Sequence, residues 1–184
     1  MRNVEFKAEL RDFSLAKSIC ARLGARHVVT MRQTDTYYRV ANGRLKKRES
    51  VILEPDGPIE EPVEVIYYHR SNTPEPKVST FTTYSEAEAR GHFGTGELPI
   101  WLVVRKTRSL WMLGPTRIHL DDVEDLGSFV EFESMISKSH TQAKARQANE
   151  KLRAALGPML GEPIACSYSD LLALELETEP VPGQ

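Results

Sequence analysis

The sequence predicts an α+β fold in which about eight antiparallel strands close into a barrel, or tunnel, flanked by a few helices. Two observations support this prediction. Alternation of apolar and polar residues marks about eight strands, and most are joined by the short turns that antiparallel neighbours allow. Closing so many strands into a barrel also removes the unpaired edges of an open sheet. The 184 residues fit one domain, expected over 1–175, with a flexible tail at 178–184.

The first half of the chain, 1–84, is expected to hold most of the strands and one helix. The helix follows the first strand, because Asp12 or Ser14 can cap its start and Gly24 can end it. Asn42-Gly43 predicts a tight hairpin turn, since both positions tolerate a positive φ. The strands expected here are 3–10, 36–41, 44–49, 63–70 and 77–84, with an acidic, proline-rich loop at 54–62.

The second half, 100–175, repeats this composition of strands and one helix, which suggests a weak internal repeat. Between the halves, 85–99 has no apolar periodicity and several breakers, so we expect an irregular linker without a helix. The elements expected after it are strands 100–113, 116–123 and 128–136, separated by turns at Gly114-Pro115 and Leu126-Gly127, and a helix over 141–156 that ends at Gly157.

The overall composition limits the kinds of partner. The chain has 24 basic and 26 acidic side chains and a formal charge of −2, whereas general polyanion binders usually carry a clear basic excess. No segment has the ~18 uncharged apolar residues of a membrane span, and the N-terminus lacks the apolar core of a signal peptide. Cys20 and Cys166 are expected to be buried, reduced thiols. We therefore expect a cytoplasmic protein without nucleic-acid or membrane partners.

Charged residues share one face on five of the expected strands, because residues of equal parity in a strand point the same way. These sets are Glu5 and Lys7; Lys46 and Arg48; Lys106 and Arg108; Arg117, His119 and Asp121; and Glu131 and Glu133. Two topologies satisfy the pattern. The charges face solvent around an apolar interior, as in a lipocalin-like barrel, or they line the lumen while helices cover an apolar outside. Periodicity leaves both open, and the second requires the charges to pair or to meet ligands.

Six short segments, in their order and spacing, resemble the CYTH superfamily, the triphosphate tunnel metalloenzymes that include class IV adenylate cyclases and thiamine triphosphatases. The segments are Val4–Lys7, Gln33–Tyr38, Gly43–Glu49, Val104–Arg108, Arg117–Asp121 and Leu126–Glu133. The resemblance runs from about residue 3 to 134 and extends to the segment Ser167–Leu172. It implies the second topology, an eight-stranded tunnel with a charged lumen.

The resemblance also implies a function for the charged residues. The expected ligand is a triphosphate-containing small molecule, with Lys7, Lys106 and Arg108 in catalysis and Lys46, Arg48, Arg70, Lys77 and Arg117 in substrate binding. Mg²⁺ or Mn²⁺ is expected on Glu5, Asp121, Glu131 and Glu133. Hard divalent cations prefer such oxygen ligands, and phosphoryl transfer depends mainly on positioning and charge neutralisation.

Three activities remain open at this point. A class IV cyclase, which converts ATP into cyclic AMP and pyrophosphate, is slightly preferred because of the GRLK and RIHLD segments. The alternative enzyme is a triphosphatase acting on tripolyphosphate, thiamine triphosphate or a nucleoside triphosphate. A non-catalytic binding module is the third, because Asn3 replaces the first glutamate of the E-x-E-x-K segment usual in the family. His119 is interpreted as a structural histidine, and a homodimer is expected by resemblance only.

Overall fold

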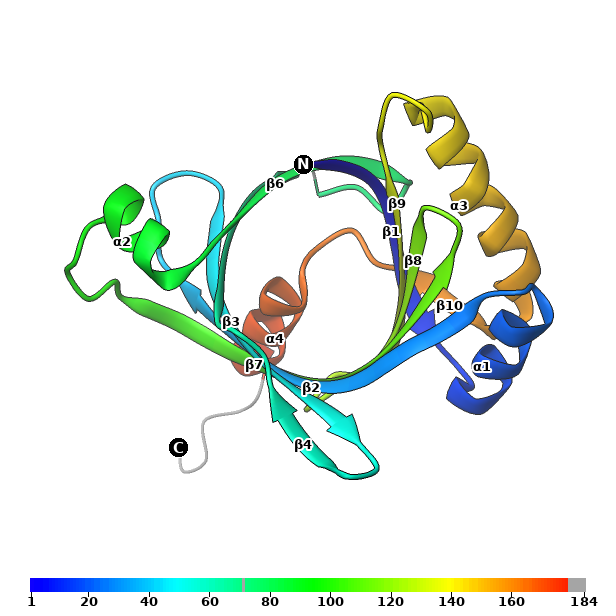
Figure 1. Cartoon of the computed structure of the whole chain (residues 1–184), viewed down its shortest axis with the longest axis horizontal. Helices are drawn as coiled ribbons and strands as arrows, with labels where there is room; N and C mark the ends of the chain where they lie inside the picture. The colour runs from blue at the N-terminus through cyan, green and yellow to red at the C-terminus, as the bar shows by residue number, and fades with distance from the viewer. Residues whose placement is uncertain (71, 179–184) are drawn as a thin grey trace.

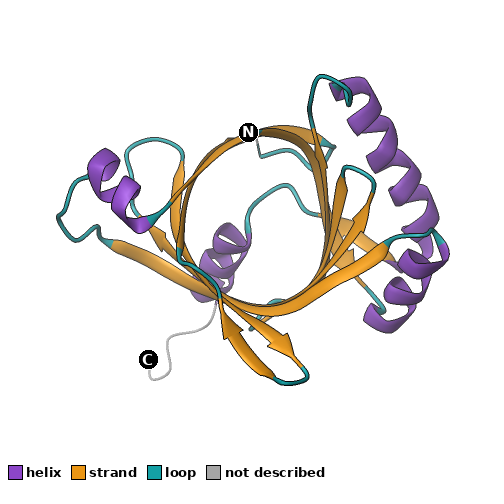
Figure 2. Cartoon of the chain, in the orientation of Figure 1, coloured by secondary structure: helices purple, strands orange, loops and turns teal. Residues whose placement is uncertain are grey.

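The computed structural model describes residues 1–70 and 72–178, with the exception of the side chains of Arg70 and Thr178. Its strands are β1 (Arg2–Leu10), β2 (Arg26–Tyr38), β3 (Arg44–Glu54), β4 (Gly57–Glu60), β5 (Glu64–Arg70), β6 (Lys77–Tyr84), β7 (Ile100–Leu113), β8 (Thr116–Val123), β9 (Gly127–Met135) and β10 (Leu160–Pro163). Eight of them form a closed antiparallel barrel in the order β1, β6, β5, β3, β2, β7, β8, β9, with β9 paired back to β1 (Figures 1 and 2). The predicted fold class is confirmed.

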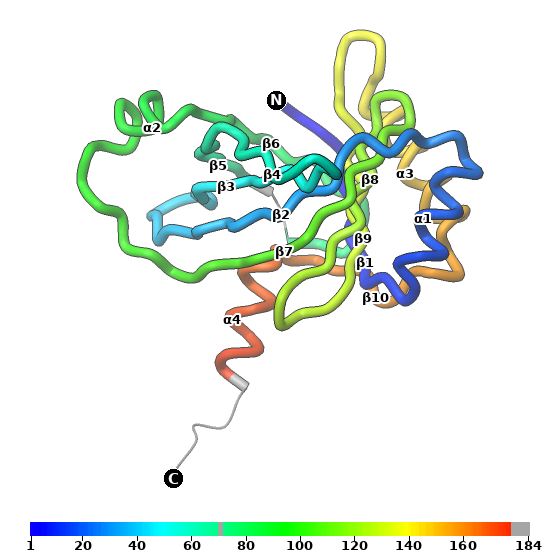
Figure 3. Tube along the Cα trace, turned by 60° about the horizontal axis from the view of Figure 1, so that its bottom comes forward, coloured from blue at the N-terminus to red at the C-terminus, as the bar shows by residue number. Residues whose placement is uncertain are grey.

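Within the described residues, four α-helices pack around the barrel or at its end: α1 (Phe13–Arg22), α2 (Glu86–Phe93), α3 (Gln142–Leu156) and α4 (Tyr168–Thr178); a short 3-10 helix, η1 (Gly157–Met159), follows α3. Figure 1, a view down the barrel, shows α1 and α3 together on one outer side and α2 on the opposite side. The same view shows α4 within the outline of the ring, and Figure 3 shows it at one end of the barrel. Two outer walls and one end of the barrel are therefore covered.

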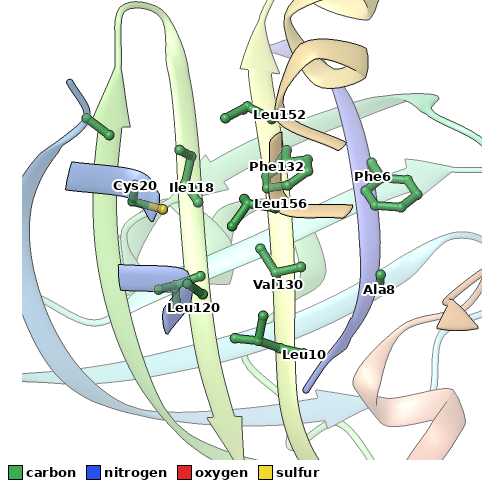
Figure 4. Packing of buried hydrophobic residues seen from close by; sticks show 12 residues of the cluster. Phe6, Ala8, Leu10, Cys20, Ile118, Leu120, Val130, Phe132, Leu152 and Leu156 are labelled. Carbon is green, nitrogen blue, oxygen red and sulfur yellow. The ribbon is translucent and has the colours of Figure 1, made fainter. Parts of the chain in front are cut away.

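The main apolar core lies outside the barrel, under α1 and α3 (Figure 4). Outward-facing side chains of β1, β8 and β9 pack against Ala16 and Cys20 of α1 and Leu152 and Leu156 of α3. The buried barrel residues in this core are Phe6, Ala8, Leu10, Ile118, Leu120, Val130 and Phe132. Because helices cover these apolar faces, the opposite, charged faces point into the lumen. This placement excludes the lipocalin-like arrangement.

The helix starts follow from local capping. Of the two predicted caps for α1, the structure uses Asp12, whose Oδ1 accepts a hydrogen bond from the Leu15 amide at 2.8 Å. Thr141 caps α3 in the same way, and Gly157 follows its last residue, as predicted. Both cysteines are free thiols, although Cys166 is only partly buried.

The prediction that 85–99 contains no helix was wrong, since α2 lies within it. Ser85 and Glu88 form a reciprocal capping box, which stabilises two of the unpaired amides at the start of the helix. Ala89 and Phe93 then pack over Leu45, Tyr67 and neighbouring residues of the barrel wall. The Ser-x-x-Glu spacing was the available signal, and the weak apolar periodicity obscured it.

The predicted hairpin at Asn42-Gly43 was also wrong in detail. The strand expected at 36–41 is the end of the longer β2, which stops at Tyr38, and five residues connect it to β3. Of this connection only Gly43 has a positive φ, of 68°. The loop expected at 54–62 contains β4, which extends β3 as a hairpin, and β10 and α4 were likewise not predicted.

The strands of each half of the chain lie side by side, and the two sets meet at two seams to close one barrel. β2 pairs with β7 and β1 pairs with β9, so each half is bounded on both sides by strands of the other. Of the predicted flexible tail only Thr178 is described, as the last residue of α4, and 179–184 lie outside the described residues. Among the described residues, none of the helices combines the length and apolar character needed to cross a membrane.

Candidate functional site

The lumen of the barrel holds a cavity of about 620 Å³, and all eight strands contribute charged or polar side chains to its wall, with apolar ones such as Phe81 and Leu110 between them. The inward positions are the ones that strand parity groups together, such as Lys46 with Arg48 and Lys106 with Arg108. Ser167 and Tyr168, at the start of α4, also line the cavity. The candidate site is therefore a tunnel with one end occupied by α4.

A single buried carboxylate, Asp35, organises the basic side of the cavity. Its Oδ1 accepts from Nε of Arg48 at 2.7 Å, and its Oδ2 accepts from Nη2 of Arg48 at 2.8 Å. The same Oδ2 accepts from Nζ of Lys46 at 2.9 Å and from Nζ of Lys106 at 2.7 Å. The structure thus brings together three predicted phosphate-binding residues, held by one carboxylate.

The electrostatics of this cluster follow from burial and from its surplus of positive charge. Burial alone raises the pKa of Asp35, but the charges of Arg48, Lys106 and Lys46 outweigh it and hold that pKa well below its usual range. Burial lowers the pKa of Lys106 to about 7 and that of Lys46 to about 8, against the attraction of Asp35. An additional anion in the lumen would favour the charged form of both lysines.

A second pairing joins Arg108 to Asp121 in a bidentate fork. Nε and Nη2 of Arg108 donate to the two Asp121 oxygens at 2.7 and 2.6 Å, and the Tyr168 hydroxyl donates to Oδ2 at 2.8 Å. Asp121 is fully buried, and Arg108 outweighs the effect of burial to lower its pKa. The structure therefore places the predicted metal ligand Asp121 between an arginine and a tyrosine.

A third cluster contains two of the other predicted metal ligands. Glu131, Glu133 and His119 each present a ligand atom, and these atoms lie within 4.8 Å of one another. Burial raises the pKa of Glu131, but Lys7, His119 and Arg108 together hold it well below its usual range, so the carboxylate is ionised at neutral pH. Two carboxylates and an imidazole form a donor set that fits a divalent cation.

Glu5 and Lys7 lie beside this cluster on β1. In the strand pairing Glu5 is opposite Glu133, and Lys7 is opposite Glu131. Nζ of Lys7 lies 3.7 Å from Oε1 of Glu131 and 3.8 Å from the centre of the Tyr168 ring. Both predicted residues are buried in the lumen wall.

The remaining predicted residues are more peripheral. Nζ of Lys77 donates to the backbone carbonyls of Thr73 and Ala165, and so ties β6 to the segment that precedes α4. The half-exposed Arg117 lies 3.7 Å from Glu133, measured between Nη1 and Oε2. Arg70 ends β5, and its side chain lies outside the description.

Sequence reasoning missed the roles of Asp35 and Tyr168. Asp35 lies just before the strand expected at 36–41, and only the longer β2, from Arg26 to Tyr38, gives it the parity that turns it into the lumen. Tyr168 belongs to an unpredicted helix, and no local signal links it to Asp121, 47 residues away.

Comparison with known proteins identifies one family model and several similar structures. Residues 64–160 match the model of the CYTH domain. A candidate adenylate cyclase from Vibrio parahaemolyticus has a TM-score of 0.65 at 17% identity, covering 93% of this chain and 97% of that one. A protein from Pyrococcus horikoshii has a TM-score of 0.64 at 18% identity, covering 92% and 98%. A chain of the Schizosaccharomyces pombe Mediator head module has a TM-score of 0.59 at 9% identity, covering 88% and 97%.

At these identities the structural matches show a shared fold. The search of curated proteins gave no match.

Proposed function

Because the chain belongs to the CYTH family, we propose that it is a metal-dependent phosphoryl-transfer enzyme that takes a triphosphate-containing small molecule into its tunnel. The observation that carries the proposal is the sorting of charge inside one cavity. Lys46, Arg48 and Lys106 surround a single carboxylate on one side, and a carboxylate and imidazole cluster lies on the other. One side suits phosphate oxygens and the other suits a divalent cation.

The basic residues would bind and orient the triphosphate. Arg48 offers a planar fork to phosphate oxygens, and the lysines act as compact charges on flexible stems. Asp35 leaves positive charge uncompensated, since one carboxylate faces three cations. Arg108 is held in place by its fork to Asp121, so its position would require little reorganisation when charge develops on the phosphate. We assign Lys7, Lys106 and Arg108 to the reacting phosphate, and Lys77 and Arg117 to the outer contacts.

The acidic cluster would hold Mg²⁺ or Mn²⁺. Glu131 and Glu133 supply carboxylate oxygens, with Glu5 adjacent on the neighbouring strand. When bound, such an ion neutralises charge on the phosphate oxygens and on the leaving group. Lys7 and Arg108 lie within 3.7 and 3.3 Å of the Glu131 oxygens and would hold that carboxylate in place between the two sides of the cavity.

For the reaction itself we propose the class IV cyclase type first, in which the ribose 3′-oxygen of ATP attacks the α-phosphate and pyrophosphate leaves. The candidate cyclase from Vibrio parahaemolyticus with the same fold supports this preference, as do the GRLK and RIHLD segments. Incubation with ATP and Mg²⁺ or Mn²⁺, followed by separation of nucleotides, tests it. Formation of cyclic AMP and pyrophosphate would support the cyclase. Release of inorganic phosphate from ATP or tripolyphosphate, without cyclic AMP, would instead identify a triphosphatase.

A matched pair of variants tests whether the tunnel is the site. Lys46 points into the lumen, whereas its neighbour Lys47 pairs with Glu49, with 3.2 Å between Nζ and Oε1. Lys46→Ala is expected to reduce turnover by at least about tenfold, since it removes a charge from the phosphate cluster, and Lys47→Ala is expected to leave turnover unchanged. Equal activity of the two variants would contradict the assignment. Tripolyphosphate binding without turnover under both metals would identify a binding module instead.

A further inference from the structure

The inward face of β8 carries three polar residues, and two of them have clear partners. Asp121 is held by Arg108 and Tyr168, and Arg117 lies beside Glu133. The third, His119, is only 4% exposed and lies between them on the same face. Its position therefore requires a partner within the lumen.

The imidazole of His119 has an unsatisfied nitrogen. Among the described residues its Nδ1 has no hydrogen-bond partner, and the atom lies 3.6 Å from Oε2 of Glu131. On the β7 side the residue opposite His119 is Leu110, whose side chain offers no donor or acceptor. Buried polar atoms rarely remain without a partner, so this nitrogen points to a group that the protein itself does not supply.

The surroundings of the nitrogen indicate which group. His119 and Glu131 are direct cross-strand partners on β8 and β9, and Glu133 is one pleat farther along the same face. Ligand atoms around one divalent ion lie roughly 3–4.5 Å apart, because the bonds are ~2.0–2.2 Å long. The three side chains already have ligand atoms within 4.8 Å of one another. A small closure would bring all three to one cation.

We propose that His119 is a ligand of the metal site, so that the site prefers a divalent transition-metal ion such as Mn²⁺ over Mg²⁺. The proposal rests on the metal site of the proposed function. Imidazole nitrogen is a poor ligand for Mg²⁺, which favours oxygen, and a better one for first-row transition ions. Part of the Glu131 charge is also taken up by Lys7 and Arg108, which increases the share of binding that the imidazole supplies.

Electron paramagnetic resonance of Mn²⁺ bound to the whole protein tests this assignment directly. In the wild type we expect electron spin-echo modulation from a directly bound ¹⁴N nucleus, and we expect that signal to disappear in His119→Gln. The Mn²⁺ dissociation constant should rise at least about tenfold, a loss that even outer partners of metal ligands commonly cause. The Mg²⁺ dissociation constant, measured by competition, should change less. His27→Gln, at an exposed histidine, is the control and should alter none of these values.

The result does not depend on the variant folding or on turnover. Labelling the histidines of the wild type with ¹⁵N should convert the ¹⁴N modulation into the ¹⁵N pattern. Wild-type Mn²⁺ without nitrogen modulation would overturn the proposal, as would an equal loss of Mn²⁺ and Mg²⁺ affinity in His119→Gln. If the nitrogen signal is present while no triphosphate is turned over, the metal assignment stands and the proposed catalytic function fails.

Discussion

Asp35→Asn is the most informative single change in the tunnel, because one carboxylate holds three cations. The substitution keeps the size of the side chain and removes its charge. Removing one partner of a buried ion pair costs about 3–5 kcal/mol of unfolding free energy, since the other charge remains buried. A domain of this length loses about 2–4 °C in Tm per kcal/mol, so we expect the Tm to fall by roughly 6–20 °C.

The loss should depend on pH in a defined direction. Asp35 stabilises the charged form of Lys106, whose pKa burial lowers to about 7. At pH 6 this lysine is charged and the full attraction is lost in the variant, whereas at pH 9 it is already neutral in the wild type. The fall in Tm is therefore expected to be larger at pH 6 than at pH 9.

A triphosphate should partly replace the missing carboxylate. Thermal unfolding with and without tripolyphosphate is the assay, and ligand at 100 times its Kd contributes about 2.7 kcal/mol. We expect the polyanion to raise the Tm of Asp35→Asn more than that of the wild type. Asp122→Asn, at an exposed neighbour of the buried Asp121, is the matched control and should melt like the wild type. A Tm of Asp35→Asn within about 2 °C of the wild type at both pH values, which corresponds to at most about 1 kcal/mol, would refute the reasoning.

Three further predictions concern protonation, the tunnel end and one turn. Tripolyphosphate binding at pH 8 should take up protons, because Lys106, with a pKa of about 7, becomes charged beside the anion. Calorimetry in buffers of different ionisation enthalpy should show this uptake at pH 8. It should show almost none at pH 6, where the lysine is already charged. Tyr168→Phe removes the 2.8 Å hydrogen bond to Asp121 and should lower the free energy of unfolding, measured in urea, by about 1.5–3 kcal/mol. A loss below about 0.5 kcal/mol would contradict the importance of that hydrogen bond. Gly43→Ala should lower the free energy of unfolding more than Gly24→Ala does. Both glycines have a positive φ, but of the two only Gly43 has a side-chain atom, in His69, within 2.8 Å of the position of an added Cβ. Equal urea midpoints for the two variants would contradict this prediction.

Much of the site could be predicted because strand parity is local. Glu131 and Glu133 share a face whatever surrounds the strand, and the hairpin around Leu126-Gly127 places His119 opposite Glu131. The register of that hairpin, counted back from Val123 opposite Gly127, thus identifies His119 as the third member of the metal cluster. The capping box of Ser85 and Glu88 was another local signal, and it predicts α2 more reliably than the weak apolar periodicity does.

Contacts between distant residues could not be found in this way. Asp35 meets Lys106 across 71 positions of sequence, and Tyr168 meets Asp121 across 47. The first contact depends on the pairing of β2 with β7, which joins the two halves of the chain. The second depends on where α4 is placed after β10. Neither contact can be predicted from a local pattern of residues.

The sequence by itself determined which side chains share a face, because the period of two is a property of the extended backbone. It did not determine which face is inside, since the same alternation of residues fits a barrel with its charged faces outside and one with its charged faces in the lumen. Tertiary structure decided that question through α1 and α3, which cover the apolar faces of β1, β8 and β9. Because the apolar surface is buried outside the barrel, closure of the barrel brings the charged side chains together in the lumen. There the free-energy cost of removing them from water can be offset only by pairing of cations with carboxylates, or by a bound anion and metal.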